Sequence, residues 1–80
     1  MRTPDKWDEF EKAMWDPTVS DETRHYARVT HGDLRRMNFP EPEFVCVDDG
    51  RVLASWQVGR ATLWLRVEGS DVSWSWNDDD

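Results

Sequence analysis

The chain has 80 residues, with 17 acidic and 10 basic side chains and a net charge of −7. This length predicts one small domain over residues 1–80. The acidic excess disfavours nucleic acid and anionic membrane as direct partners, because phosphate binding needs basic residues, and it favours a basic protein surface. The alternative is that the charge simply keeps an aromatic-rich protein soluble.

Six tryptophans supply the rich core that so short a chain needs for stability. The single cysteine, Cys46, excludes an internal disulfide. No apolar run approaches the ~18 residues of a membrane span, and the N-terminus shows no signal-peptide pattern. We therefore expect a cytoplasmic protein.

The N-terminal residues predict a first helix. It begins at Thr3 or Asp5, with Pro4 in the first turn, and ends at Asp16-Pro17. The apolar positions are Trp7, Phe10 and Met14, at helical spacing, and they are expected to cover the apolar face of a sheet. The opposite side carries Asp5, Glu9 and Asp16, with Asp8 at its edge, and Lys12 is able to pair with Asp8 or Asp16.

Ser20 or Asp21 is expected to cap a second helix, within the helical part that spans residues 1–38. Its predicted buried face consists of Tyr26, Ala27, Thr30, Leu34 and Met37. Beside it runs a basic stripe of Arg24, Arg28, His31 and Arg35. Gly32 weakens this helix, and Thr30 with Asp33 offers an alternative capping box that would start a separate short helix.

Pro40-Glu41-Pro42 separates this helical part from a part rich in strands. Three turn signals follow at regular spacing, namely Asp49-Gly50, Gly59-Arg60 and Gly69-Ser70. Each suits a two-residue hairpin loop, of type I′ for Asp-Gly and type II′ for the pairs that begin with glycine. The turns predict a four-stranded antiparallel meander over residues 43–48, 51–58, 61–68 and 71–77, and thus an α+β fold.

Two-residue loops also predict the register of the sheet. The expected pairs are Val47 with Val52, Val45 with Ala54, Val58 with Ala61, Trp56 with Leu63, Ala54 with Leu65, Val52 with Val67, Val67 with Val72, Leu65 with Trp74, and Leu63 with Trp76. All of these side chains fall on one face, which we take as the core face, and a slip of one residue would destroy that agreement.

The other face is mostly polar but carries an apolar patch of Phe44, Cys46, Leu53 and Trp64. In the predicted register Phe44 and Trp64 both flank Ser55, and Cys46 lies opposite Leu53. An exposed apolar patch usually marks an interface, for a second copy or for another protein. The alternative is that an N-terminal segment covers it. A tryptophan at position 64 has no evident role in folding, which makes Trp64 the strongest candidate for a binding hot spot.

Motifs for chemistry are missing from the sequence. His25 and His31 do not have the spacing of a helical metal pair, and Cys46 has no Cys/His signature and apolar neighbours that would raise its thiol pKa. No serine stands on a nucleophile elbow, and no glycine-rich loop could cradle a phosphate. We expect neither enzymatic activity nor a metal or cofactor.

Acidic residues gather in three places: the first helix, the residues beside the first and third turns, and the tail. The helix stripe can be neutralised by Lys12 and by Arg24, Arg28 and Arg35, and the tail of Asp78, Asp79 and Asp80 is expected to be disordered. The turn cluster consists of Asp48, Asp49, Glu68 and Asp71. With Arg51 as its only expected counter-charge, it is the best candidate for a site that imitates DNA phosphates.

The segment Pro40-Glu41-Pro42, Val45, Asp49-Gly50, Val52, Ala54 and Trp56 resembles a hairpin that recurs in small uncharacterised bacterial and phage proteins. In size, acidity, aromatic content and lack of catalytic residues, the whole chain resembles phage-encoded anti-CRISPR proteins, in particular inhibitors of type I (notably type I-C) Cascade. This resemblance implies action inside a bacterial host cell, by binding a subunit of a CRISPR effector at the surface that recognises target DNA.

The sequence thus predicts a small acidic protein that inhibits a nucleic-acid-binding complex by occupying its basic surface. Its expected binding residues are those of the turn cluster and of the apolar patch. The alternative is a homodimeric structural or regulatory module, such as an antitoxin-like protein, assembled through the Phe44/Trp64 face.

Overall fold

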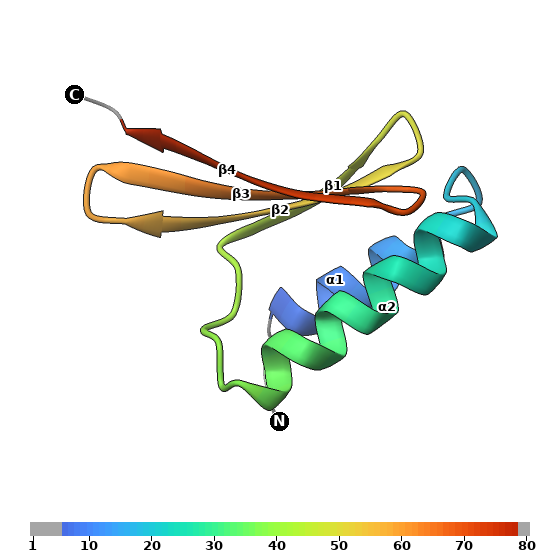
Figure 1. Ribbon diagram of the computed structural model, residues 1–80, viewed down its shortest axis with the longest axis horizontal. Helices are drawn as coiled ribbons and strands as arrows, with labels where there is room; N and C mark the ends of the chain where they lie inside the picture. The colour runs from blue at the N-terminus through green and yellow to red at the C-terminus, as the bar shows by residue number, and fades with distance from the viewer. Residues whose placement is uncertain (1–5, 79–80) are drawn as a thin grey trace.

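The computed structural model describes residues 6–78. Two helices, α1 (Lys6–Met14) and α2 (Asp21–Arg36), precede four strands, β1 (Phe44–Asp48), β2 (Arg51–Val58), β3 (Ala61–Glu68) and β4 (Asp71–Asp78). The strands form one antiparallel sheet in the order β1-β2-β3-β4. Both helices lie on the same side of this sheet (Figure 1), so the α+β prediction is confirmed.

The register of the sheet is the predicted one at every expected pair, from Val47 opposite Val52 to Leu63 opposite Trp76. Asp49 and Gly50 have φ angles of 53° and 78°, as a type I′ turn requires. At the other two loops only the first residue has a positive φ, 63° at Gly59 and 59° at Gly69, which fits type II′. Turn chemistry and alternation therefore determine which side chains share a face.

Helix α1 buries its predicted stripe of Trp7, Phe10 and Met14. It ends at Met14, close to the predicted end, and its predicted start at Thr3 or Asp5 lies outside the described residues. Of the two carboxylates considered as partners of Lys12, that of Asp16 accepts hydrogen bonds from the Thr18 N–H at 2.9 Å and from the Thr18 hydroxyl at 2.6 Å. These two bonds lower the pKa of Asp16 and shape the turn after the helix.

Helix α2 is continuous through Gly32, so the alternative of a separate short helix is wrong. The Thr30 hydroxyl donates to the carbonyl of Tyr26 at 2.9 Å rather than capping a new helix. Ser20 is the N-cap, and its hydroxyl accepts the N–H of Thr23. At the other end Asn38 takes a left-handed φ of 58°. The N–H groups of Asn38 and Phe39 donate to Arg35 and Leu34, the pattern of a Schellman motif.

The buried face of α2 differs from the predicted one. Its buried residues are Thr23, Ala27 and Leu34, whereas Tyr26 and Met37 are exposed at its rim. His31, predicted in the exposed basic stripe, instead packs against α1. Its ring stacks on Phe10 with centroids 5.4 Å apart and meets Trp7 edge-on at 5.3 Å. Helical spacing alone leaves the centre of a buried face uncertain by about one residue, and the contact with α1 decides it.

The segment from Phe39 to Glu43 carries the chain from the helices back to the sheet. Phe39 packs edge-on against Trp56, with ring centroids 5.3 Å apart. The indole N–H of Trp56 donates to the carbonyl of Pro40 at 2.7 Å. Pro42 is fully buried. The predicted break at Pro40-Glu41-Pro42 is thus a packed connection that ties the helical layer to β2.

The helices cover only part of the core face. Helix α1 packs on β1 and β2, and α2 packs on β2 and β3. The β2–β3 loop and the end of β4 extend past the helices (Figure 1). Trp56 on β2 is accordingly only 4% exposed, whereas Trp74 and Trp76 on β4 are 43% and 56% exposed. The prediction that all three tryptophans belong to the core is therefore wrong for the two on β4.

Candidate protein-binding surface

Among residues 6–78 no helix lies on the second face of the sheet, and we call it the open face. Both helices and the connection that follows them lie on the other side (Figure 1). The alternative that an N-terminal segment folds over this face is therefore wrong for every residue from 6 onward. Neither helix of the structure is long and apolar enough to cross a membrane.

The register arranges the side chains of the open face in rows across the strands. The central rows are Cys46–Leu53–Arg66–Ser73 and Phe44–Ser55–Trp64–Ser75. A charged row at one end comprises Asp48, Arg51, Glu68 and Asp71, and a polar row at the other comprises Gln57, Thr62 and Asn77. An apolar centre surrounded by polar side chains is the usual anatomy of a protein interface.

Phe44 and Trp64 form the aromatic part of this centre. Their rings meet edge-on with centroids 6.2 Å apart. Phe44 is 50% exposed, and Trp64 is half-buried. Between them Ser55 is buried, with 7% exposure. Since the two rings flank Ser55 on the neighbouring strands, Trp64 shields a polar residue and has a modest role in folding that its sequence position did not reveal.

Beside the aromatic pair the surface is hollowed. A shallow depression is lined by Leu53, Trp64, Arg66, Ser73, Trp74 and Ser75. Apolar and polar groups thus meet in one place, with a guanidinium and two hydroxyls next to an indole ring. Cys46 lies at the β1 side of the same row as Leu53, and burial, followed by the charge of Asp48, raises the pKa of its thiol as expected. A protonated thiol here adds to the apolar surface.

The turn cluster is brought together as predicted but is less acidic than expected. Arg51 donates to Glu68 at 2.6 Å and lies 4.0 Å from Asp49. The hydrogen bond from Arg51, and then its charge, lower the pKa of Glu68. Arg66 lies 3.6 Å from Asp71, so the prediction of Arg51 as the only counter-charge is wrong. The two arginines come from neighbouring strands on the open face, and the predicted register already places Arg66 diagonally across from Asp71, so this pair could have been found from the sequence.

The start of α2 supports this end of the sheet. The hydroxyl of Thr23 accepts the N–H of Gly69 at 2.8 Å and a hydrogen bond from Ser20. A side chain at Gly50 would come within 2.9 Å of the Thr18 carbonyl, so the first turn also packs closely against the connection between the helices. Both turns that carry the acidic residues are therefore held in place by the helical layer.

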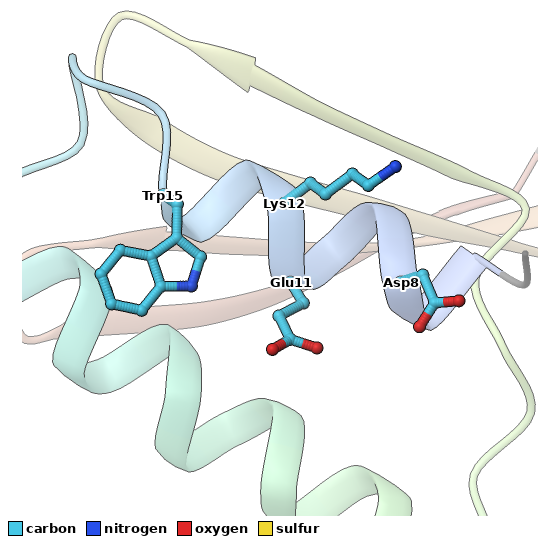
Figure 2. Close-up of a pocket in the computed structure, with 4 residues that line it drawn as sticks. All are labelled: Asp8, Glu11, Lys12 and Trp15. Carbon is cyan, nitrogen blue, oxygen red and sulfur yellow. The ribbon is translucent and has the colours of Figure 1, made fainter.

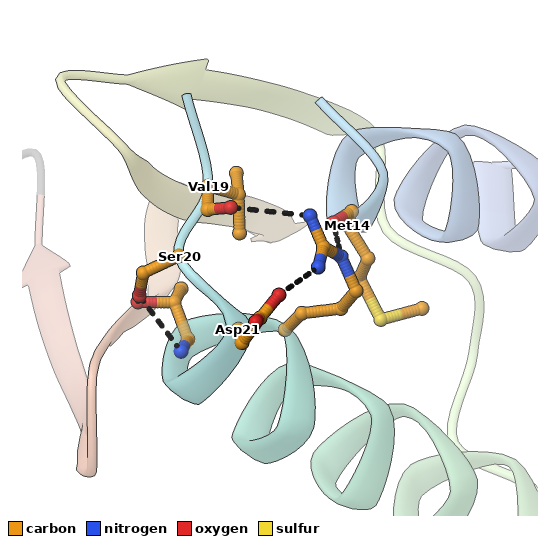
Figure 3. A network of polar contacts seen from close by, with 6 residues as sticks. Met14, Val19, Ser20 and Asp21 are labelled. Carbon is orange, nitrogen blue, oxygen red and sulfur yellow. Dashed lines mark hydrogen bonds and ion pairs between the residues drawn. The ribbon is translucent and has the colours of Figure 1, made fainter. Parts of the chain in front are cut away.

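Arg24, predicted as part of the basic stripe of the second helix, instead joins the two helices. Its guanidinium donates to the carbonyls of Met14 and Val19 at 2.8 and 3.1 Å, and to Asp21 at 2.7 Å (Figure 3). It also lies 4.9 Å from the ring centre of Trp15. Arg24 therefore completes the C-terminus of α1 rather than neutralising the acidic stripe of that helix.

The acidic stripe of α1 borders a second shallow hollow, lined by Asp8, Glu11, Lys12 and Trp15. Asp8 and Glu11 point to the same side of the helix as Trp15, and Lys12 points away (Figure 2). Lys6 pairs with Glu9 at 3.1 Å. Trp15 is 60% exposed with the Arg24 guanidinium over its ring, and charged side chains make up the rest of the lining, so this hollow has one apolar residue where the open face has four.

Within residues 6–78, no three His, Cys, Asp or Glu side chains are grouped so that they could hold a metal ion. Asp78, predicted as part of the acidic tail, is the last residue of β4, and Asp79 and Asp80 lie outside the described residues. No protein family, curated protein or solved structure was found to match this chain. Function is therefore argued from the surface itself.

Proposed function

We propose that this protein works by docking its open sheet face onto another protein, without catalysis. The observation that carries the proposal is the apolar centre of Phe44, Cys46, Leu53 and Trp64 on a face that no helix covers. Aromatic side chains at the centre of a surface, with polar groups around them, are the usual source of binding energy between proteins.

The charge of the chain supports a basic partner. The net charge is −7, and the charged row at the edge of the open face keeps carboxylates beside the apolar centre. Arg51 and Arg66 offset part of that charge locally, so the apolar centre supplies the affinity and the overall charge steers the encounter. A basic surface that binds DNA is a partner of this kind. The resemblance to anti-CRISPR proteins gives a concrete case, a type I-C Cascade whose DNA-binding surface would be blocked.

Competition with target DNA tests this proposal. Purified type I-C Cascade would be mixed with labelled target DNA and increasing amounts of the protein, and bound DNA would be measured by mobility shift. We expect the protein to displace DNA, and the affinity of protein for Cascade to fall steeply between about 50 and 200 mM salt. Undiminished DNA binding at saturating protein would overturn Cascade as the target, and salt-independent binding would overturn charge steering.

Matched variants separate the open face from the rest of the molecule. Trp64→Ala should weaken binding to Cascade by at least about thirtyfold. Asp48→Lys should weaken it less, through a slower association rate. Trp76→Ala, an exposed tryptophan on the other face, is the control and should leave affinity unchanged. Equal losses for Trp64→Ala and Trp76→Ala would contradict docking by the open face.

Sedimentation of the protein alone tests the homodimer alternative. A monomer at high concentration leaves the open face available to another protein. A dimer that Trp64→Ala converts to monomer would show that a second copy occupies this face.

A further inference from the structure

The free edge of β4 is a second surface, distinct from the open face. Of the two outer strands, β1 has five residues and is supported by α1, whereas β4 has eight and no comparable helix contact among residues 6–78. Among residues 6–78, the main helix contacts are with β1, β2 and β3. Native proteins usually shorten, cover or charge such an edge, because its unpaired backbone groups form a template for another strand.

The β3–β4 turn decides which backbone groups of β4 face outward. Gly69 and Ser70 form a two-residue loop between the paired residues Glu68 and Asp71. Residues that flank such a loop exchange their hydrogen bonds, and the pattern alternates along the strand. Asp71, Ser73, Ser75 and Asn77 therefore turn their N–H and C=O groups toward β3. Val72, Trp74, Trp76 and Asp78 turn theirs outward.

The outward-facing backbone positions include both exposed tryptophans. The ring of Trp74 packs against two aromatic rings, with its centroid 5.6 Å from that of Trp56 and 6.1 Å from that of Phe39. Trp76 lies opposite Leu63 and is 56% exposed. We call the rings of Trp74 and Trp76 the indole shelf. A strand that paired with β4 would place alternate side chains beside this shelf, while its backbone bonded to the backbone of Trp74 and Trp76.

Charge selects the occupant of this edge. Residues 72–77 carry no charged side chain, but Asp71 and Asp78 stand at the two ends of the strand, and the sequence continues with Asp79 and Asp80. An antiparallel second copy that paired Trp74 with Trp76 would bring Asp71 of each chain against the acidic tail of the other, between two molecules of net charge −7. Like charges oppose that pairing, whereas lysine or arginine at the ends of an incoming strand would meet carboxylates. Of these, Asp71 is partly offset by Arg66 at 3.6 Å, and Asp78 has no arginine or lysine within ion-pair distance among residues 6–78.

From the free edge, the indole shelf and the terminal carboxylates together, we infer that β4 docks an extended segment of another protein. That segment has alternating apolar residues at its centre and basic residues at its ends, and it adds to the sheet as a fifth strand. The inference does not depend on the proposed function, because the open face uses Phe44 and Trp64, whereas Trp74 and Trp76 belong to the helix side of the sheet, with Trp74 also lining the edge of the open-face depression.

A synthetic peptide of alternating valine and threonine with a lysine at each end is the probe. Binding is measured by titration calorimetry and by the amide shifts of β4 in the folded 80-residue chain. We expect the amides of Val72, Trp74 and Trp76 to shift and to become protected from hydrogen exchange. A version with glutamates at the ends should bind at least about tenfold more weakly.

Two variants of the protein and one control variant make the test specific. Cys46 permits ligation of a synthetic segment 46–80, in which the Trp76 amide is N-methylated. This change removes an outward N–H and keeps the side chain and the β3 pairing, and it should weaken peptide binding at least about tenfold. Asp78→Lys should reduce the preference for the lysine peptide, because Asp71, Asp79 and Asp80 remain. Trp64→Ala should leave peptide binding unchanged.

The inference is overturned if the two peptides bind equally, if N-methylation at Trp76 has no effect, or if the shifts map to Phe44 and Trp64. It is also overturned if the protein alone sediments as a dimer that N-methylation converts to monomer, because a second copy would then occupy the edge. Loss of competition on Cascade by Trp64→Ala, with peptide binding retained, would separate this surface from the proposed function.

Discussion

Trp56 and Trp76 lie on the same face of the same sheet, yet one is 4% and the other 56% exposed. Alternation along the strands places both indoles on the helix side. Helices α1 and α2 extend over β1, β2 and β3, so Trp56 is covered and Trp76 is not. The pleat of a strand therefore decides the direction of a side chain, and the reach of the helical layer decides its burial.

The largest expected effect on stability is at Trp56, the tryptophan that the helices cover. Trp56→Ala removes a buried indole and its hydrogen bond to Pro40, and should cost about 3–5 kcal/mol of the free energy of unfolding. Trp76→Ala should cost less than about 1 kcal/mol, since its ring is already largely in water. Urea denaturation of both variants measures the difference. Similar losses would show that the helical layer does not determine burial.

Removing the contact that holds the two helices together should have the next largest effect. Arg24→Ala deletes the bonds to the Met14 and Val19 carbonyls and should cost about 2 kcal/mol. Arg28→Ala is the control, because Arg28 is exposed on the same helix, and should change stability by less than about 0.5 kcal/mol. Thermal and urea denaturation measure both. An Arg24→Ala variant as stable as Arg28→Ala would contradict the capping role.

The open face should tolerate change better than the covered one. Trp64→Ala removes an edge-on contact with Phe44 and the cover over Ser55, and should cost about 1 kcal/mol, well below the cost at Trp56. The same denaturation series measures this value. A loss as large as that of Trp56→Ala would mean that the open face contributes a core of its own and would weaken its role in binding.

The smallest expected effect concerns pH at the turn cluster. Arg51 lowers the pKa of Glu68 in the folded protein. The pair therefore stabilises the fold fully at pH values above the unfolded pKa of about 4.3, and this stabilisation is lost as pH falls through the lower folded pKa. Carbon NMR titration of the Glu68 carboxyl should show a midpoint below that of an unperturbed glutamate. Arg51→Met should return the midpoint to the ordinary range. An unchanged midpoint would show that the pair does not persist in solution.

Local chemistry made the sheet predictable. Each of the three turns has a two-residue loop, and each loop determines a register without reference to the rest of the chain. The positions of Phe44, Cys46, Leu53 and Trp64 on one face follow from that register. The end of α1 and the cap at Ser20 could be predicted for the same reason, since they depend on a few consecutive residues.

The errors arose where segments distant in sequence meet. His31 belongs to the helical interface because α1 supplies Trp7 and Phe10 against it, and Arg24 reaches carbonyls up to ten residues away. The helical and strand periods relate only residues within one element, so they do not reveal such contacts. Arg66 on β3 pairs with Asp71 on the neighbouring strand β4, a contact that the predicted register could have shown.

By itself, the sequence determined the strands, their register and the face on which each side chain lies, because turns and pleat act over a few residues. The tertiary structure alone decided how far the helices extend over that sheet. It thereby decided which tryptophans became core and which remained available for binding, because burial depends on what packs above a residue rather than on the direction in which it points.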